Sequence, residues 1–197
     1  MKLILKSNTY VLLQMFFFWI VIINPLEAQN VIVKEADKAL VAAALHGDVQ
    51  AIKKAINEGA NIDIQDDEGF TPLNRAAKLS YFHLVKYYIE LGADVNIPNN
   101  NKITPLHYGV EYNNVKIVNL LLEEGANIDA RDSIQECPLH WAGWTGNYEV
   151  AKLLLKYGAN PYTKNNTGVT PIDLTVRQEH KKLEKLFKKK RYKKLNK

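Results

Sequence analysis

The residue types that most often carry chemistry meet in one short run, Cys137-Pro138-Leu139-His140. A thiol and an imidazole three residues apart are the components of a nucleophile with its base, or of two ligands to zinc. A structural zinc site needs about four such ligands, and this is the chain's single cysteine. His107 lies 33 residues before His140, in a similar run. We therefore expect no bound metal and no catalytic thiol.

The clustered carboxylates are a weaker indication of chemistry. Asp66, Asp67 and Glu68 are consecutive, and Glu123 and Glu124 precede a glycine, so these groups fit a loop tip and a helix end. Solvated charge is the usual explanation at such places. The chain has no glycine-rich phosphate-binding loop and no nucleophile elbow of the hydrolase type. We expect no enzymatic activity, no cofactor and no small-molecule substrate.

Two short motifs recur with a step of 33 residues through the body of the chain. One is a Thr-Pro-Leu run with small variations, and the other is a Gly-Ala pair. The first motif starts at Thr71, Thr104, Cys137 and Thr170, and the second starts at Gly59, Gly92, Gly125 and Gly158. Because two independent markers keep one period four times, the body is predicted to be an internal repeat.

Each repeat predicts two short helices followed by a hairpin-like loop of about 12 residues. Thr71 provides an N-cap oxygen, and the proline after it presets φ for the first helical position. Leu73, Ala76 and Ala77 then make a narrow apolar stripe, whose small residues allow close contact between helices. The second helix is predicted to end at Gly92, which supplies a left-handed C′ residue.

The 33-residue period and the Thr-Pro-Leu-His run resemble the ankyrin repeat. The resemblance covers about residues 34–188 and implies an all-α solenoid of stacked helix-turn-helix units joined by hairpin-like loops. Five units are expected, at about residues 34–66, 67–99, 100–132, 133–165 and 166–188, with caps at both ends. In this family the motif histidines, here His107 and His140, hydrogen-bond the adjoining turn.

Some positions depart from the family pattern. The loop normally has a glycine, as at Gly69 and Gly168, but Lys102 and Gln135 stand there in the third and fourth units. We expect those two loops to bend differently. Cys137 replaces the N-cap threonine, and loss of an N-cap oxygen typically costs about 0.5 to 2 kcal/mol.

The outward side of the first helices is the clearest functional candidate. If the small apolar stripe faces the core, eight residues on three successive units face away from it. They are Arg75, Lys78, Tyr108, Glu111, Tyr112, Trp141, Trp144 and Thr145. The resemblance implies that such positions line a concave groove that binds partner proteins, here flanked by Phe70, Ile103 and Glu136. Clustered exposed aromatics are typical of interface hot spots, and the alternative is that the two tryptophans are ordinary core.

The N-terminus has the layout of a signal peptide. Lys2 and Lys6 form a positive start, residues 11–23 are almost wholly apolar, and a more polar segment ends at Ala28. The apolar run would make roughly 20 Å of helix, short of the roughly 30 Å hydrocarbon layer. We expect cleavage after Ala28 and an exported protein, periplasmic or secreted. Leu26 is large for the third position before that cut, so an uncleaved membrane anchor is the alternative.

Charge divides the chain into unlike parts. Residues 29–176 carry 13 basic and 18 acidic residues, a net charge of −5, whereas residues 177–197 carry 11 basic and 2 acidic residues, a net charge of +9. The body is therefore a poor candidate for binding nucleic acid. The predicted organisation is a signal peptide over 1–28, an ankyrin repeat domain over 29–188 and a basic tail over 189–197.

The basic tail fits three interpretations. It is a solvated extension of the last helix, a contact to an anionic membrane or nucleic acid, or a nuclear-localisation patch of an exported effector. We expect membrane or nucleic-acid binding only through this tail. The main expectation is a non-catalytic protein–protein interaction module whose partner occupies the concave groove.

Overall fold

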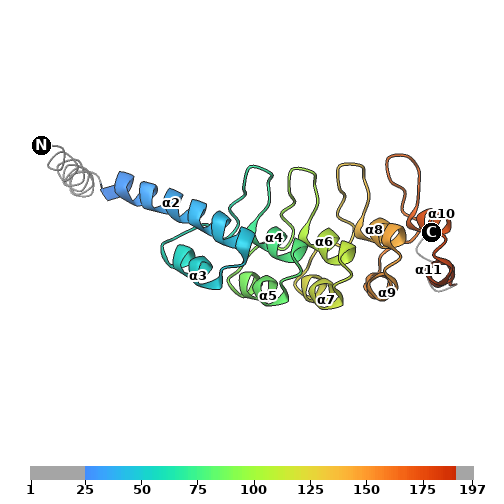
Figure 1. The fold of residues 1–197 in the computed structure, drawn as a ribbon. Coiled ribbons are helices and arrows are strands. Elements are labelled where there is room, and N and C mark those ends of the chain that lie inside the picture. Colours follow the sequence, from blue (N-terminus) through green and yellow to red (C-terminus); the bar gives the residue numbers. More distant parts are fainter. Residues whose placement is uncertain (1–24, 190–197) are drawn as a thin grey trace, which may run out of the picture.

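The computed structural model describes residues 25–189, which form a row of stacked helix pairs with long loops along one edge (Figure 1). The first pair is α2 (Pro25–His46) with α3 (Val49–Asn57). The later pairs are α4 (Pro72–Lys78) with α5 (Phe82–Glu90), α6 (Pro105–Glu111) with α7 (Val115–Glu123), α8 (Pro138–Thr145) with α9 (Tyr148–Lys156), and α10 (Pro171–Arg177) with α11 (Lys181–Phe187). Residues 25–189 contain no strand, so the prediction of an all-α repeat fold is confirmed.

The first helix of each later pair begins at the predicted proline. Proline suits this place because its fixed φ is helical and the N–H it lacks would have no partner within the helix. At α4 the Thr71 hydroxyl oxygen accepts a hydrogen bond from the Asn74 N–H at 3.1 Å. At α8 the backbone N–H of Cys137 donates to Nδ1 of His140 at 3.2 Å. The sequence motif therefore marks where these helices start.

The predicted stripe of small residues is confirmed as the contact between neighbouring first helices. Leu73, Ala76 and Ala77 on α4 are fully buried. At Gly143 on α8 a Cβ atom would lie 2.5 Å from the carbonyl oxygen of Pro171. Only a residue without a side chain allows α10 to come this close to α8.

The motif histidines join neighbouring repeats. Nε2 of the buried His107 donates to the Glu136 carbonyl of the next loop at 3.2 Å, and its Nδ1 accepts from the Thr104 N–H at 3.3 Å. His140 repeats this arrangement toward the Val169 carbonyl at 3.1 Å. Because a carbonyl only accepts and a backbone N–H only donates, each ring is neutral with its proton on Nε2. The turn-bonding role implied by the resemblance is confirmed.

The loops between pairs share one backbone conformation. Gly69 and Gly168 have φ of 78° and 79°, and Lys102 and Gln135 have φ of 60° and 65°. All four residues lie in the left-handed region, so the expectation that two of these loops bend differently is wrong.

The physical reason is a side chain at the start of each loop. Its Oδ1 atom accepts the backbone N–H groups two and four residues later, which holds the turn with or without glycine. We call these four residues the loop anchors: Asp66, Asn99, Asp132 and Asn165.

The first helix differs from the others in length. α2 has 22 residues, whereas α4, α6 and α10 have 7 each. It begins at Pro25, so the predicted cleavage position after Ala28 falls inside a helix. The apolar run at 11–23, on which the signal-peptide prediction depends, lies outside the described residues, as does most of the basic tail. Within the described range no helix has the length and apolar character needed to cross a membrane.

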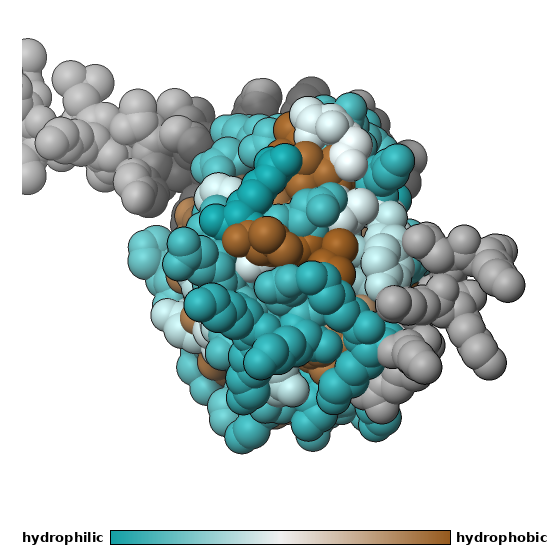
Figure 2. All heavy atoms as spheres, turned by 90° about the vertical axis from the view of Figure 1, so that its right-hand side faces the viewer, coloured by the Kyte–Doolittle hydropathy of each residue, from teal (hydrophilic) through white to brown (hydrophobic). Residues whose placement is uncertain are grey.

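The opposite end of the row carries a mainly polar surface. Figure 2 looks onto α10 and α11 and shows a hydrophilic surface with a small hydrophobic strip near its centre. Val176 on α10 is 52% exposed there, whereas the equivalent Val110 on α6 is buried by the next pair. A polar outer face is what a terminal repeat needs for solubility.

Replacing Gly69 with alanine is expected to destabilise the protein more than replacing Gly168. Both positions are left-handed, which costs an L-residue about 1 to 2 kcal/mol. At Gly69 the new Cβ would also lie 2.6 Å from the backbone nitrogen of Asn100, whereas at Gly168 no described atom lies within 4 Å. Urea unfolding followed by circular dichroism measures both losses. Equal losses would mean that the loops of neighbouring repeats do not touch at Gly69.

Stability is expected to fall as the pH drops from about 6.5 to about 4. Burial lowers the pKa of His107 to about 4, while an unfolded histidine titrates near 6.5. The unfolded chain binds more protons in this window, so protonation favours unfolding, by about 3 kcal/mol over the whole window. The position equivalent to His107 in the preceding repeat is the buried Asn74, so the fold already accommodates asparagine there.

The substitution His107→Asn is therefore expected to remove about 2 kcal/mol of the pH dependence between pH 7 and pH 4.5. Urea unfolding at the two pH values measures it. The exposed His83, replaced in the same way, is the control and should leave the fall intact. An unchanged fall in His107→Asn would contradict the neutral buried ring.

Candidate functional site

A groove opens beside α8 and α10, near the C-terminal end of the row. Its volume is about 580 Å³. We call it the Trp144 groove; its lining residues are Glu111, Ile134, Glu136, Trp141, Trp144, Thr145, Asn165, Asn166, Thr167, Val169, Leu174 and Arg177. These residues come from the ends of first helices and from loop tips of three successive repeats. The stacking of the repeats therefore creates the groove.

Trp144 presents the largest free apolar surface in this groove. Its side chain is 58% exposed, the highest value among the large hydrophobic residues described, and Ile134 is 49% exposed. The backbone around Trp144 is held in place because its carbonyl accepts a hydrogen bond from Nε2 of His180 at 3.1 Å. An exposed indole on a fixed backbone is typical of a binding surface.

Trp141 has a different environment from Trp144. Its Nε1–H donates to Oδ2 of the loop anchor Asp132 at 2.9 Å, and its ring meets the His107 ring edge-on at a centroid distance of 5.2 Å. The side chain is half-buried. Trp141 therefore forms a fixed wall of the groove, and the two tryptophans do not act as one exposed pair.

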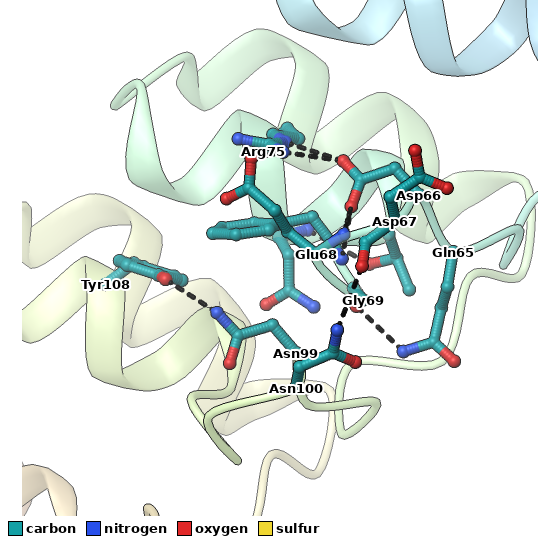
Figure 3. A network of polar contacts seen from close by, with 12 residues as sticks. Gln65, Asp66, Asp67, Glu68, Gly69, Arg75, Asn99, Asn100 and Tyr108 are labelled. Carbon is teal, nitrogen blue, oxygen red and sulfur yellow. Dashed lines mark hydrogen bonds and ion pairs between the residues drawn. The ribbon is translucent and has the colours of Figure 1, made fainter.

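The contact between Asp132 and Trp141 is one case of a recurring arrangement. Each of the first three loop anchors also binds the side chain nine residues later, on the first helix that follows. Figure 3 shows the first two of these contacts, Asp66 with Arg75 and Asn99 with Tyr108. Oδ2 of Asp66 accepts from Nε and Nη2 of Arg75 at 3.0 and 2.6 Å. Nδ2 of Asn99 donates to the Tyr108 hydroxyl at 3.0 Å. The sequence analysis did not identify the loop anchors. The pattern that could have identified them is an Asp or Asn placed nine residues before each outward-facing residue of a first helix.

The last loop anchor has no such partner on its own helix. The position nine residues after Asn165 is Leu174, which carries no hydrogen-bonding group. Nδ2 of Asn165 donates instead to Oε1 of Glu136 in the preceding loop, at 2.9 Å. This bond joins two of the loops that line the Trp144 groove.

Three predicted site residues lie in a separate, closed cluster. The Tyr108 ring stacks on Phe70 at a centroid distance of 5.6 Å, and the guanidinium of Arg75 lies 3.8 Å from the Phe70 centroid. Nζ of Lys78 lies 4.9 Å from the same centroid. We call Phe70, Arg75, Lys78 and Tyr108 the Phe70 cluster.

The expectation that Tyr108 faces solvent is wrong, because the side chain is only 4% exposed. The loop residue Phe70 covers one face of its ring, and the hydroxyl is held by Asn99. Burial raises the pKa of Tyr108 to about 12. Of the other predicted residues, Glu111, Trp144 and Thr145 line the groove together with Trp141, whereas Tyr112 is exposed outside its lining.

The run at Cys137 and His140 has the contacts of a structural pair. Sγ of Cys137 lies 3.1 Å from Nδ1 of His140, and both residues are fully buried. Burial raises the pKa of the thiol and lowers the pKa of the imidazole, so both groups are neutral. A nucleophilic cysteine must instead be ionised to the thiolate. Among residues 25–189 no group of three or more His, Cys, Asp or Glu side chains is placed to hold a metal ion.

Comparison with models of protein families places the chain among repeat proteins. A family model described as ankyrin repeats (3 copies) matches the chain over residues 40–132 and again over residues 82–165. The two matches together run from α2 through α9 and include the fourth-repeat side of the Trp144 groove, with Ile134, Trp141 and Trp144. A search of curated proteins found no match.

Alanine at the two tryptophans should separate their roles. Trp141→Ala is expected to lower the free energy of unfolding by about 3 kcal/mol, because it removes a half-buried indole and the donor to Asp132. Trp144→Ala should lower it by less than about 1 kcal/mol, because most of that side chain is already in water. Urea unfolding measures both. A large loss in Trp144→Ala would show that this side chain belongs to the core.

Proposed function

The chain belongs to the ankyrin-repeat family, whose members are generally non-catalytic protein–protein interaction modules, and we propose on that basis that it binds a partner protein through the Trp144 groove. Shape complementarity and the burial of apolar surface supply the affinity, and no covalent bond is made or broken.

The exposure of Trp144 is the observation that carries the proposal. Burying an exposed indole of this size contributes about 2 to 3 kcal/mol, and hot spots of this kind dominate many interfaces. Ile134 extends the apolar surface, while Asn166 and Thr167 give the groove a polar rim. A central aromatic anchor with a polar rim is the usual anatomy of a protein interface.

We also propose that the protein is exported. The support is the sequence pattern of residues 1–28, with its positive start and apolar run. N-terminal sequencing of the protein isolated from its source distinguishes the cleaved form from one that keeps the segment as an anchor. A chain beginning at Gln29 is the expected result.

The basic tail supports a second candidate function, binding to an anionic membrane or to nucleic acid. Residues 189–197 hold 6 basic residues and no acidic residue. Deleting these nine residues tests the candidate with phosphatidylserine vesicles and double-stranded DNA. Unchanged sedimentation with vesicles and an unchanged DNA mobility shift would remove this candidate.

Affinity capture with Trp144→Ala as the comparison tests the proposed groove. Partners identified by mass spectrometry with the wild-type protein should bind the variant at least tenfold more weakly, because the exposed indole is the main anchor. Leu45→Ala is a matched control, since Leu45 lies three repeats earlier at the equivalent position and is 44% exposed. The Leu45→Ala control should capture the same partners as the wild-type protein. Equal capture by the wild-type protein and Trp144→Ala would exclude the groove as the binding site.

A further inference from the structure

The Trp144 groove and the Phe70 cluster, two repeats earlier, have different residue types at equivalent positions. In the Phe70 cluster the loop supplies the aromatic ring, and the following helix supplies the cations Arg75 and Lys78. Sixty-six residues later the loop position is Glu136, and the two helix positions are Trp141 and Trp144. The groove therefore has rings where the cluster has cations.

Both cations of the Phe70 cluster already have partners within the protein. Its two cations lie against the Phe70 ring, and Arg75 also forms an ion pair with Asp66 at 2.6 Å, with both side chains at most 15% exposed. A cation over an aromatic face is attracted by the ring quadrupole, more strongly where water is excluded.

The Trp144 groove has the rings and the acids, but among residues 25–189 no cation forms an ion pair with those acids. Glu111 and Glu136 both line it, and within residues 25–189 neither carboxylate has a basic side chain within 4 Å. The one basic residue in the lining is Arg177, whose side chain is exposed to solvent. The lining carries a net negative charge, and no cation of residues 25–189 lies against its most exposed ring, Trp144.

The two acids are also partly withdrawn from water. Burial raises the pKa of Glu111, with Lys78 opposing the shift, and burial raises the pKa of Glu136, with the hydrogen bond from Asn165 opposing it. Desolvating a carboxylate without a cation is unfavourable, and a cation arriving with a ligand offsets that cost.

We propose that the Trp144 groove takes a lysine or arginine side chain of the partner protein. The alkyl stem of this side chain lies along Trp144 and Ile134, and its charge faces Glu111 and Glu136. Long basic side chains have this double character, with an apolar stem and a charged end. The inference rests on the proposed function, because it names the chemistry of the partner at the same groove.

Selection from a library of random 12-residue peptides displayed on phage tests the inference. The full-length protein is the bait, and Trp144→Ala is the counter-selection bait that removes peptides binding elsewhere. We expect the retained peptides to share one Lys or Arg at a fixed position. In synthetic copies, norleucine at a lysine position keeps the stem and removes the charge, and it should weaken binding at least tenfold by fluorescence anisotropy.

The double variant Glu111→Gln with Glu136→Gln tests the protein side of the contact. It should bind the basic peptide at least fivefold more weakly and the norleucine peptide with unchanged affinity. The matched control is Glu123→Gln with Glu124→Gln, which removes the same charge at an exposed helix end. This control should change the affinity less than twofold.

Three outcomes would overturn the inference, and they are distinguishable. Peptides that depend on Trp144 but share no basic residue, or equal losses in the two double variants, would reject the cation and leave the groove as the binding site. A failure to find any peptide that depends on Trp144 would reject the proposed function as well. A tenfold rise in the peptide's affinity on deleting residues 189–197 would show that the chain's own basic tail occupies the groove, which would overturn the assignment to a separate partner protein.

Discussion

The rest of the structure depends on the hydrogen bonds of the loop anchors. One Asp or Asn side chain in each 33-residue period holds the loop turn through two backbone N–H groups, and three of the four also hold a side chain on the next first helix. The same few atoms therefore set the direction of the loop and the position of the surface residue beside it. Since each repeat contacts mainly its neighbours, these local bonds are what align loop tips and helix ends into a continuous face.

The identity of the anchored residue decides what that face can do. Asp66 fixes Arg75 against Phe70, and the resulting cluster uses its own cations to cover its own rings. Asp132 fixes Trp141 by the same geometry, but the neighbouring Trp144 is left uncovered. One framework thus produces a closed surface in the second repeat and an open one in the fourth. The difference comes mainly from the side chains at equivalent positions, Arg75 and Lys78 in one repeat and Trp141 and Trp144 in the other.

Much of the fold could be predicted from the sequence because its signals are local. Proline after Thr71 marks a helix start wherever it occurs, and glycine at Gly92 ends a helix because it tolerates positive φ. The errors came from contacts between elements. Helical periodicity places Tyr108 on the outward side, but only the fold brings Phe70, from the loop one repeat earlier, over its ring. Lys102 can be left-handed because Asn99 holds the turn, which composition alone does not reveal.

Gly143 sets the spacing of two helices beside the Trp144 groove. The space a methyl group would need is already taken by the Pro171 carbonyl, so a larger residue at position 143 would force α10 away from α8. Leu174 and Arg177 on α10 line this groove together with Trp144 on α8. The absence of one carbon atom at position 143 therefore helps to set how far apart these lining residues lie.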